Sequence, residues 1–274
     1  MRLHLMFNAS SGKGADRADV ERDLRALGAE LVEDPGRAER IVVWGGDGML
    51  GPAAELAVTH DLPLGVVAAG TANDFATAAG LPGDPDDGLR LAATGTATRA
   101  YELGYFDDRP FVNVASAGLA PAASSRAEPF KRALGPLAYP AGAVAAGLLD
   151  KPLAVAIDGQ FDGQAWQVTF ACSGAFGGGA ELDAADPGDG LLDLVVVPAH
   201  GRRDLPGVAV AMRRGSLAER DDVLHARAPA FTARVPPGTP FTVDGELITA
   251  ETVVEMTVHA SRFALVYDNR PVSA

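Results

Sequence analysis

Three glycines surround one carboxylate in the stretch "VVWGGDGML", residues 42–50. Gly45, Gly46, Asp47 and Gly48 follow a continuous apolar run, which predicts a buried parallel strand. Glycines between such a strand and a helix let backbone N–H groups approach a phosphate closely, and the helix N-terminus adds partial positive charge. Asp47 would repel a bare phosphate, so its position suits a nearby magnesium ion or hydroxyl group. A tight turn without any ligand is the alternative interpretation.

A second glycine-bearing loop follows the next predicted strand, "LPLGVVAAG". In "GTANDFA", residues 70–76, Gly70 leaves room for a ligand, and Thr71 and Asn73 can donate hydrogen bonds to phosphate oxygens. Asp74 is equally suited to cap the helix that follows. Because neighbouring parallel strands end at the same edge of a sheet, both loops are expected at the edge where α/β proteins bind ligands.

The first predicted strand, "LHLMF", also ends in a polar loop, "NASSGKG", which contains Asn8 and Ser11. This loop lacks the GxxxxGK[ST] spacing of a Walker A motif. Three polar, glycine-bearing strand ends in succession nevertheless favour a nucleotide as the ligand.

The elements that must position these loops change in character along the chain. The first hundred residues alternate strand and helix patterns, which predicts an α/β domain with a parallel sheet over residues 1–104. Residues 105–261 consist mostly of short strands separated by turn residues, which predicts a β-sandwich-like second domain. The last strand, near residues 262–274, is expected to return to the first domain.

Composition limits the classes of partner and compartment. The chain has 274 residues, of which 47% are hydrophobic, and a net charge of −13. An acidic surface argues against general nucleic-acid binding and against permanent polybasic attachment to a membrane. A single cysteine, Cys172, cannot form an internal disulfide and is expected to be buried and inert. The N-terminus lacks a signal-peptide pattern. These features predict a cytoplasmic protein, peripheral to a membrane at most.

The motifs and their order resemble the diacylglycerol kinase catalytic-domain family, which includes bacterial lipid kinases and sphingosine kinases. The segments that carry the resemblance are "NASSG", "GGDGM", "GTANDFA", "GGGAELDAADPGDGLLDLVVV" at 177–197 and "VDGE" at 243–246. NAD kinases and 6-phosphofructokinases share only the GGDG element. The resemblance implies an NAD kinase/phosphofructokinase-like α/β domain followed by a β-sandwich-like domain.

The resemblance also implies site residues. Nucleotide phosphates would lie against the loops, at Asn8, Ser11, Gly45, Gly46, Asp47, Gly48, Gly70, Thr71 and Asn73. A magnesium ion would be held by Asp186, Asp189 and the Leu191 carbonyl, although an acidic turn without metal is the alternative. Asp244 matches the position of a general base, whereas the sphingosine kinase pattern assigns that role to Asp47. A plain Asp-Gly hairpin turn is the alternative for "VDGE".

The implied function is transfer of the γ-phosphate of ATP to a lipid hydroxyl, with diacylglycerol as the first candidate and phosphatidic acid as its product. The implied partners are Mg²⁺, ATP, a lipid substrate and a transient membrane surface. Residues 130–149 could contact that membrane surface, and an ordinary packing helix is the alternative for them. The sequence is compatible with a homodimer. The five histidines show no spacing typical of metal ligands.

Two other functions stay open. An NAD kinase-like enzyme would phosphorylate a soluble nucleotide, which "GTANDFA" disfavours. A weakened or inactive binding relative is favoured by departures from the family pattern at Met49, Gly51, Pro52 and Glu102. A shortened segment between residues 9 and 44 also departs from that pattern, as though one strand–helix unit had been trimmed.

Overall fold

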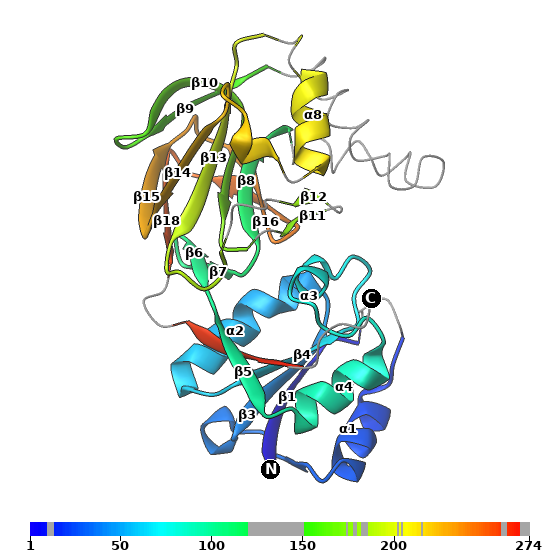
Figure 1. Cartoon of the computed structure of the whole chain (residues 1–274). Coiled ribbons are helices and arrows are strands. Elements are labelled where there is room, and N and C mark those ends of the chain that lie inside the picture. Colours follow the sequence, from blue (N-terminus) through cyan, green and yellow to red (C-terminus); the bar gives the residue numbers. More distant parts are fainter. Residues whose placement is uncertain are drawn as a thin grey trace. The chain divides into compact units, whose positions relative to one another are not determined.

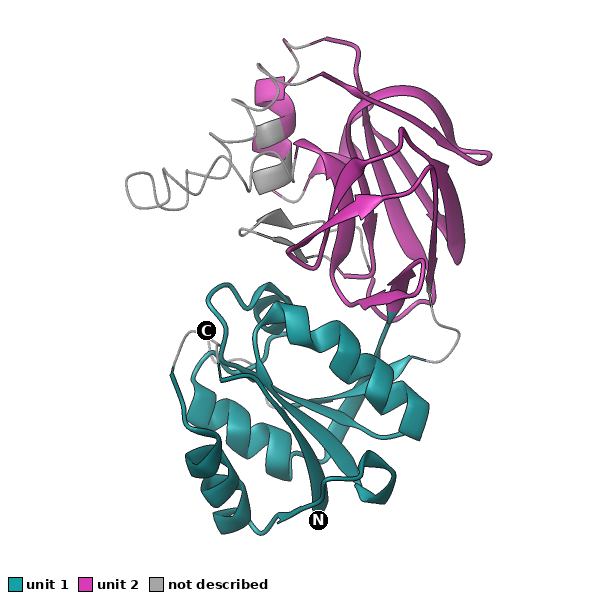
Figure 2. Ribbon diagram, turned by 180° about the vertical axis from the view of Figure 1, so that it is seen from behind, with its two compact units in different colours: residues 1–103, 260–274 teal, residues 104–259 magenta. Residues whose placement is uncertain are grey.

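The computed structural model describes residues 1–9, 14–119, 151–173, 175–177, 180–181, 186–201, 203, 205–214, 216–258 and 262–268. The predicted nucleotide ligand Ser11 and the stretch 130–149 lie outside these residues. The chain divides into two compact units (Figure 2). Unit 1 comprises Met1–Leu103 and Ala260–Ala274, and unit 2 comprises Gly104–His259.

Unit 1 contains a six-stranded sheet in the order β2-β1-β3-β4-β19-β5 (Figure 1). Its strands are β1 (Arg2–Phe7), β2 (Glu30–Leu31), β3 (Arg40–Gly45), β4 (Leu64–Ala68), β5 (Ala97–Tyr101) and β19 (Phe263–Tyr267). All neighbouring pairs are parallel except β19 and β5. The predicted parallel α/β sheet is confirmed, and β19 brings the C-terminal strand into it.

Helices cover both faces of this sheet (Figure 1). They are α1 (Arg17–Ala26), η1 (Pro35–Arg37), η2 (Asp47–Met49), α2 (Leu50–His60), α3 (Asp74–Ala78) and α4 (Pro85–Thr94). On one face, α1 and α4 pack through Leu24 and Leu89 against alternate strand residues such as Leu5 and Trp44. The other face of β3 and β4 carries α2. This alternation of side chains along each strand is what buries both faces of the sheet.

Unit 2 is built almost entirely from antiparallel strands, as predicted for a β-sandwich-like domain. Its strands are β6 (Gly104–Phe106), β7 (Arg109–Phe111), β8 (Val114–Gly118), β9 (Leu153–Ile157), β10 (Phe161–Ala171), β11 (Ala175–Gly177), β12 (Ala180–Glu181), β13 (Leu192–Pro198), β14 (Leu224–Ala228), β15 (Ala230–Arg234), β16 (Thr239–Val243), β17 (Glu246–Ala250) and β18 (Val253–Val258). One core, around Phe170 and Phe241, contains side chains from β8, β10, β13, β16 and β18. A second core, around Trp166, lies under α8 (Leu205–Arg213) and η6 (Leu217–Glu219).

Cys172 is 2% exposed, in agreement with the prediction of a buried thiol. Among the described residues, no helix is both long and apolar enough to cross a membrane.

Candidate nucleotide site and acidic cluster

Two glycine loops touch each other at the carboxyl ends of β3 and β4. A Cβ placed on Gly70 would lie 2.5 Å from the Gly46 Cα, and a Cβ on Gly46 would lie 3.1 Å from the Gly70 Cα. The Ala69 amide also donates to the Gly45 carbonyl at 2.9 Å. Glycine is therefore needed at both contact positions because any side chain would force the two backbones apart.

Asp47 connects the two loops. Its carboxylate accepts hydrogen bonds from the backbone amides of Asp74 at 3.2 Å and Phe75 at 3.1 Å, which are the first residues of α3. Carboxylates at this position stabilise the unpaired N–H groups of a helix start. The side chain of Asp47 thus fixes the loop after β4 relative to the loop after β3.

Asn73 braces the second loop from within. Its side-chain oxygen accepts from the Gly70 amide at 2.8 Å, and its side-chain nitrogen donates to the Gly70 carbonyl at 3.0 Å. The residue has a φ of 55°, a left-handed conformation that asparagine tolerates better than most residues. Thr71 and Gly48, in contrast, are exposed. Their hydroxyl and backbone groups are accessible to a ligand at this edge of the sheet.

Asn8 follows β1, which pairs directly with β3. The backbone amide of Asn8 donates to the Trp44 carbonyl at 3.1 Å. The strand ends that carry Asn8, Gly45 and Gly70 are therefore neighbours in the order β1-β3-β4. The carboxyl edge of a parallel sheet is where α/β proteins bind ligands, so these three loops lie at the edge expected for a nucleotide.

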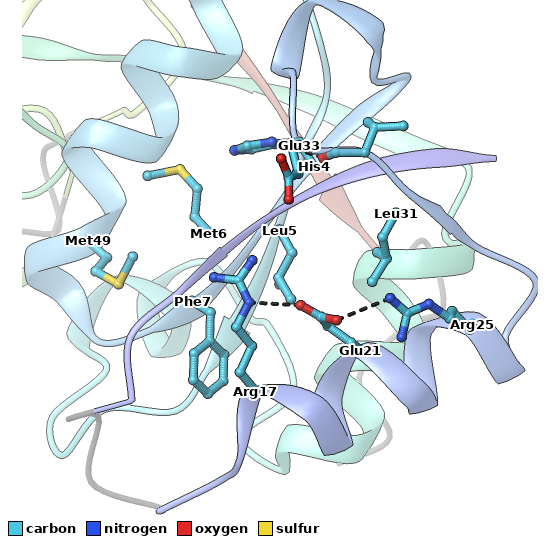
Figure 3. Close-up of a pocket in the computed structure, with 11 residues that line it drawn as sticks. His4, Leu5, Met6, Phe7, Arg17, Glu21, Arg25, Leu31, Glu33 and Met49 are labelled. Atoms are coloured by element: carbon cyan, nitrogen blue, oxygen red, sulfur yellow. Dashed lines mark hydrogen bonds and ion pairs between the residues drawn. The ribbon is translucent and has the colours of Figure 1, made fainter.

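A pocket of about 570 Å³ lies beside these loops (Figure 3). Its lining residues are His4, Leu5, Met6, Phe7, Arg17, Glu21, Arg25, Leu31, Val32, Glu33 and Met49. Phe7 directly precedes Asn8, and Met49 directly follows Gly48. The Met49 sulfur would meet a Cβ on Gly45 at 2.8 Å, so Met49, which lines the pocket, also packs against the first glycine loop.

One ion-pair network forms the helical wall of this pocket. Glu21 accepts from Arg17 Nε at 2.8 Å and from an Arg25 guanidinium nitrogen at 3.1 Å (Figure 3). These hydrogen bonds hold the pKa of Glu21 below its usual value of 4.5. Exposed pairs of this kind contribute little stability, but they orient the side chains that face the pocket.

In unit 2, Asp244 lies in the turn between β16 and β17, with φ values of 44° for Asp244 and 88° for Gly245. The hairpin turn considered from the sequence is therefore present. The Asp244 carboxylate accepts three backbone hydrogen bonds, from Val112 at 2.7 Å, Asn113 at 2.9 Å and Val114 at 3.0 Å. Protonation of this carboxylate would weaken bonds that hold the chain between β7 and β8.

The acidic loop before β13 is also held by internal contacts. Asp186 accepts from the Gly188 amide at 3.0 Å, and Asp189 accepts from the Leu191 amide at 2.9 Å. The second oxygen of Asp189 forms an ion pair with Arg227. Nowhere in the described part of the chain do three acidic, histidine or cysteine side chains gather as a metal-binding group. Magnesium binding by Asp186, Asp189 and Leu191 stays a prediction.

Asp193, in β13 directly after this loop, adds a buried carboxylate to the acidic residues. It is 1% exposed, and its carboxylate contacts His225 Nε2 at 2.5 Å and Arg227 Nε at 3.3 Å. Burial raises the pKa of Asp193, and the hydrogen bond from His225 opposes that rise. The sequence assigned no role to His225 or Arg227, since neither belongs to a recognisable motif.

Comparison with known proteins shows which family carries this arrangement. Residues 18–104 match the diacylglycerol kinase catalytic domain, and residues 113–266 match the YegS C-terminal NAD kinase beta sandwich-like domain. A relative from Pseudomonas syringae pv. tomato, named "Probable lipid kinase YegS-like", is 31% identical over 91% of this chain and 88% of its own. One of the same name from Xanthomonas oryzae pv. oryzae is 34% identical over 85% and 83%. The chain belongs to the YegS-like lipid kinase family.

Solved structures agree on the fold. A diacylglycerol kinase from Bacillus anthracis str. Sterne covers 98% of this chain with a TM-score of 0.74 and 19% identity, and the alignment includes 97% of that protein. An NAD kinase from Archaeoglobus fulgidus, solved in complex with ATP, covers 98% with a TM-score of 0.53 and 13% identity, and the alignment includes 94% of that protein. At these identities the similarity shows the fold alone.

Within the YegS-like family pattern, the departures of this chain have defined positions. Gly51 and Pro52 lie in the first turn of α2, where proline costs a helix little. Glu102 is 1% exposed and lies between β5 and β6. The segment between residues 9 and 44 contains α1 and β2, and between β2 and β3 the structure has only the short helix η1.

Proposed function

We propose that this YegS-like lipid kinase transfers the γ-phosphate of magnesium-bound ATP to the hydroxyl of a lipid, with diacylglycerol as the first candidate. One observation carries the proposal: the two glycine loops meet at the carboxyl edge of the sheet and are joined there by Asp47. Phosphoryl transfer depends mainly on positioning and charge stabilisation, so rigid loops lined by backbone N–H groups suit it.

In this proposal, the loops and the exposed Thr71 hold the phosphates, together with Asn8 and Ser11. The nucleoside part would extend into the pocket beside Phe7 and Met49, whose volume of about 570 Å³ suits a small-molecule ligand.

The reaction forms a bond between the lipid oxygen and the γ-phosphorus, and breaks the bond between that phosphorus and the oxygen bridging to the β-phosphate. ADP leaves, and the hydroxyl proton passes to a base. Asp244 and Asp47 are the two candidates for that base. Each already accepts backbone hydrogen bonds, three at Asp244 and two at Asp47.

The test is label transfer from γ-labelled ATP with magnesium to lipids in mixed micelles. Diacylglycerol, sphingosine, ceramide, phosphatidylglycerol and a polyprenol are offered separately, and NAD is offered without lipid. Asp47→Ala is compared with Asp84→Ala, because Asp84 also caps a helix in unit 1, accepting from Asp86 and Asp87. Both variants lose hydrogen bonds to a helix start, worth about 0.5–2 kcal/mol, but only Asp47 also joins the two glycine loops, so a difference in label transfer reports on the site that these loops form.

We expect label in one lipid, retained by Asp84→Ala and lost by Asp47→Ala. Label in NAD alone would move the protein to the NAD kinase-like function. Nucleotide binding without transfer to any acceptor would identify an inactive relative, and Met49, packed against the first glycine loop, would then be the first residue to revert to threonine.

A further inference from the structure

Strand pairing in unit 2 brings two aspartates, a histidine and an arginine together. In the ladder between β13 and β14, Asp193 is directly opposite Arg227, and Val195 is opposite His225. Residues opposite each other, or two apart along a strand, share one face of a sheet. Asp189, just before β13, reaches the same guanidinium. We call Asp189, Asp193, His225 and Arg227 the β13–β14 charge cluster.

Arg227 supplies the positive charge at the centre of this cluster. Its guanidinium pairs with Asp189, and its Nε lies 3.3 Å from Asp193 Oδ1. The Asp193 side chain is 1% exposed, and a carboxylate buried to that degree needs a compensating cation or a bound proton. The fixed, forked charge of arginine meets this need at all accessible pH values.

A divalent cation bound by the Asp189 and Asp193 carboxylates would offset their negative charge in the same way. Such a cation would lie beside the guanidinium that pairs with both carboxylates, and the two positive charges would repel each other there. One oxygen each of Asp186 and Asp189 also accepts a hydrogen bond from a backbone amide of the loop. The guanidinium therefore disfavours a metal ion at this cluster.

We propose that Arg227 takes the place of a divalent cation in unit 2. The guanidinium offsets the negative charge of Asp189 and Asp193 from within the chain, and the apo protein requires no metal for its stability. Removal of the guanidinium converts the cluster into a metal-binding site formed by Asp189 and Asp193. This inference does not depend on the proposed reaction, in which magnesium arrives with ATP.

The test measures metal binding to the full-length protein without nucleotide. Isothermal titration with Mg²⁺ and with Ca²⁺, and thermal unfolding with EDTA or millimolar metal at matched ionic strength, are applied to the wild type and to Arg227→Gln. Arg234→Gln is the control, because Arg234, at the end of β15, forms an exposed ion pair with Asp158, which directly follows β9. Arg227→Lys keeps the charge without the fork and is a second control, and Arg227→Ser, which also removes the guanidinium, takes the place of Arg227→Gln if that variant folds poorly.

We expect no stoichiometric metal binding by the wild type, by Arg234→Gln or by Arg227→Lys, and no effect of EDTA on their unfolding midpoints. Arg227→Gln should unfold at a lower temperature in EDTA and regain several degrees in millimolar metal, since a ligand bound only by the folded state raises its stability.

Stoichiometric binding of metal by the wild type that is lost in Asp189→Asn would overturn the proposal. Absence of metal binding in both the wild type and a folded Arg227→Gln would also overturn it. Removal of the guanidinium would then have created no metal-binding site. Neither result bears on label transfer, so failure here is distinguishable from failure of the proposed function.

Discussion

The contact between the two glycine loops leads to a sharp prediction for Gly70→Ala. The new Cβ would lie 2.5 Å from the Gly46 Cα, 2.8 Å from the Asn73 side-chain oxygen and 3.3 Å from the Gly46 nitrogen. Two of these three atoms belong to the backbone and cannot turn away as a flexible side chain would. The two loops must therefore separate.

The size of the effect follows from the overlap. Carbon atoms in contact are normally about 3.5–4.0 Å apart, so the backbones must move by about 1 Å. Overpacking of this kind costs about 1–3 kcal/mol, and we expect the upper end for Gly70→Ala. In Gly46→Ala the nearest atom is 3.1 Å away, so we expect about 1 kcal/mol. A displacement of about 1 Å at a reacting centre can lower the rate about 100-fold. We therefore expect Gly70→Ala to phosphorylate lipid about 100-fold more slowly than the wild type.

The assay compares unfolding in denaturant and label transfer for three variants in unit 1. Gly83→Ala is the control, because a Cβ there meets no atom within 4 Å. We expect stability and activity to fall in the order Gly83→Ala, Gly46→Ala, Gly70→Ala. If Gly70→Ala matched Gly83→Ala in both measurements, the loops would not be in contact as described and the reasoning would be refuted.

Three further predictions concern single side chains. Asp244→Asn offers one oxygen to three backbone donors, so denaturant unfolding should show a loss of about 2 kcal/mol. Arg40→Met leaves the carbonyls of Ala92 and Gly95 without their buried donor, so amide hydrogen exchange should accelerate at the end of α4. Glu21 has a lowered pKa, so its ionised form stabilises the fold above pH 4.5 and that contribution disappears as the pH falls through the lowered pKa. In Glu21→Gln, the free energy of unfolding measured across a pH series should not show this decrease at acidic pH.

The class of fold was predictable because its signals are local. Continuous β-branched runs such as Ile41–Trp44 predict buried parallel strands, and the turn-rich texture after residue 104 predicts antiparallel ones. The edge strand β2 was not predictable from its pattern, since it has two residues, Glu30 and Leu31. Its place at the edge depends on pairing with β1, which no local pattern encodes.

The candidate nucleotide site was predictable only in outline. The rule that parallel strands end at one edge placed the loops near each other. That Asp47 faces a metal ion or a hydroxyl stays a prediction, and the sequence did not indicate that its carboxylate also binds the amides of Asp74 and Phe75, 27 and 28 residues further along the chain. That role depends on how the two loops are oriented in space, and spacing along the chain does not determine orientation.

The β13–β14 charge cluster shows why a motif alone does not decide how its charges are neutralised. Asp189 and Asp193 belong to a recognisable element, but Arg227 becomes their partner only through the register that places it opposite Asp193. A slip of one residue would move Arg227 to the other face of the sheet and leave a buried carboxylate without its cation. Because that arrangement would be costly, the charge pair itself favours the observed register. The cation that pairs with this acidic element in the chain is therefore set by the residue that the neighbouring strand places beside it, and not by the motif.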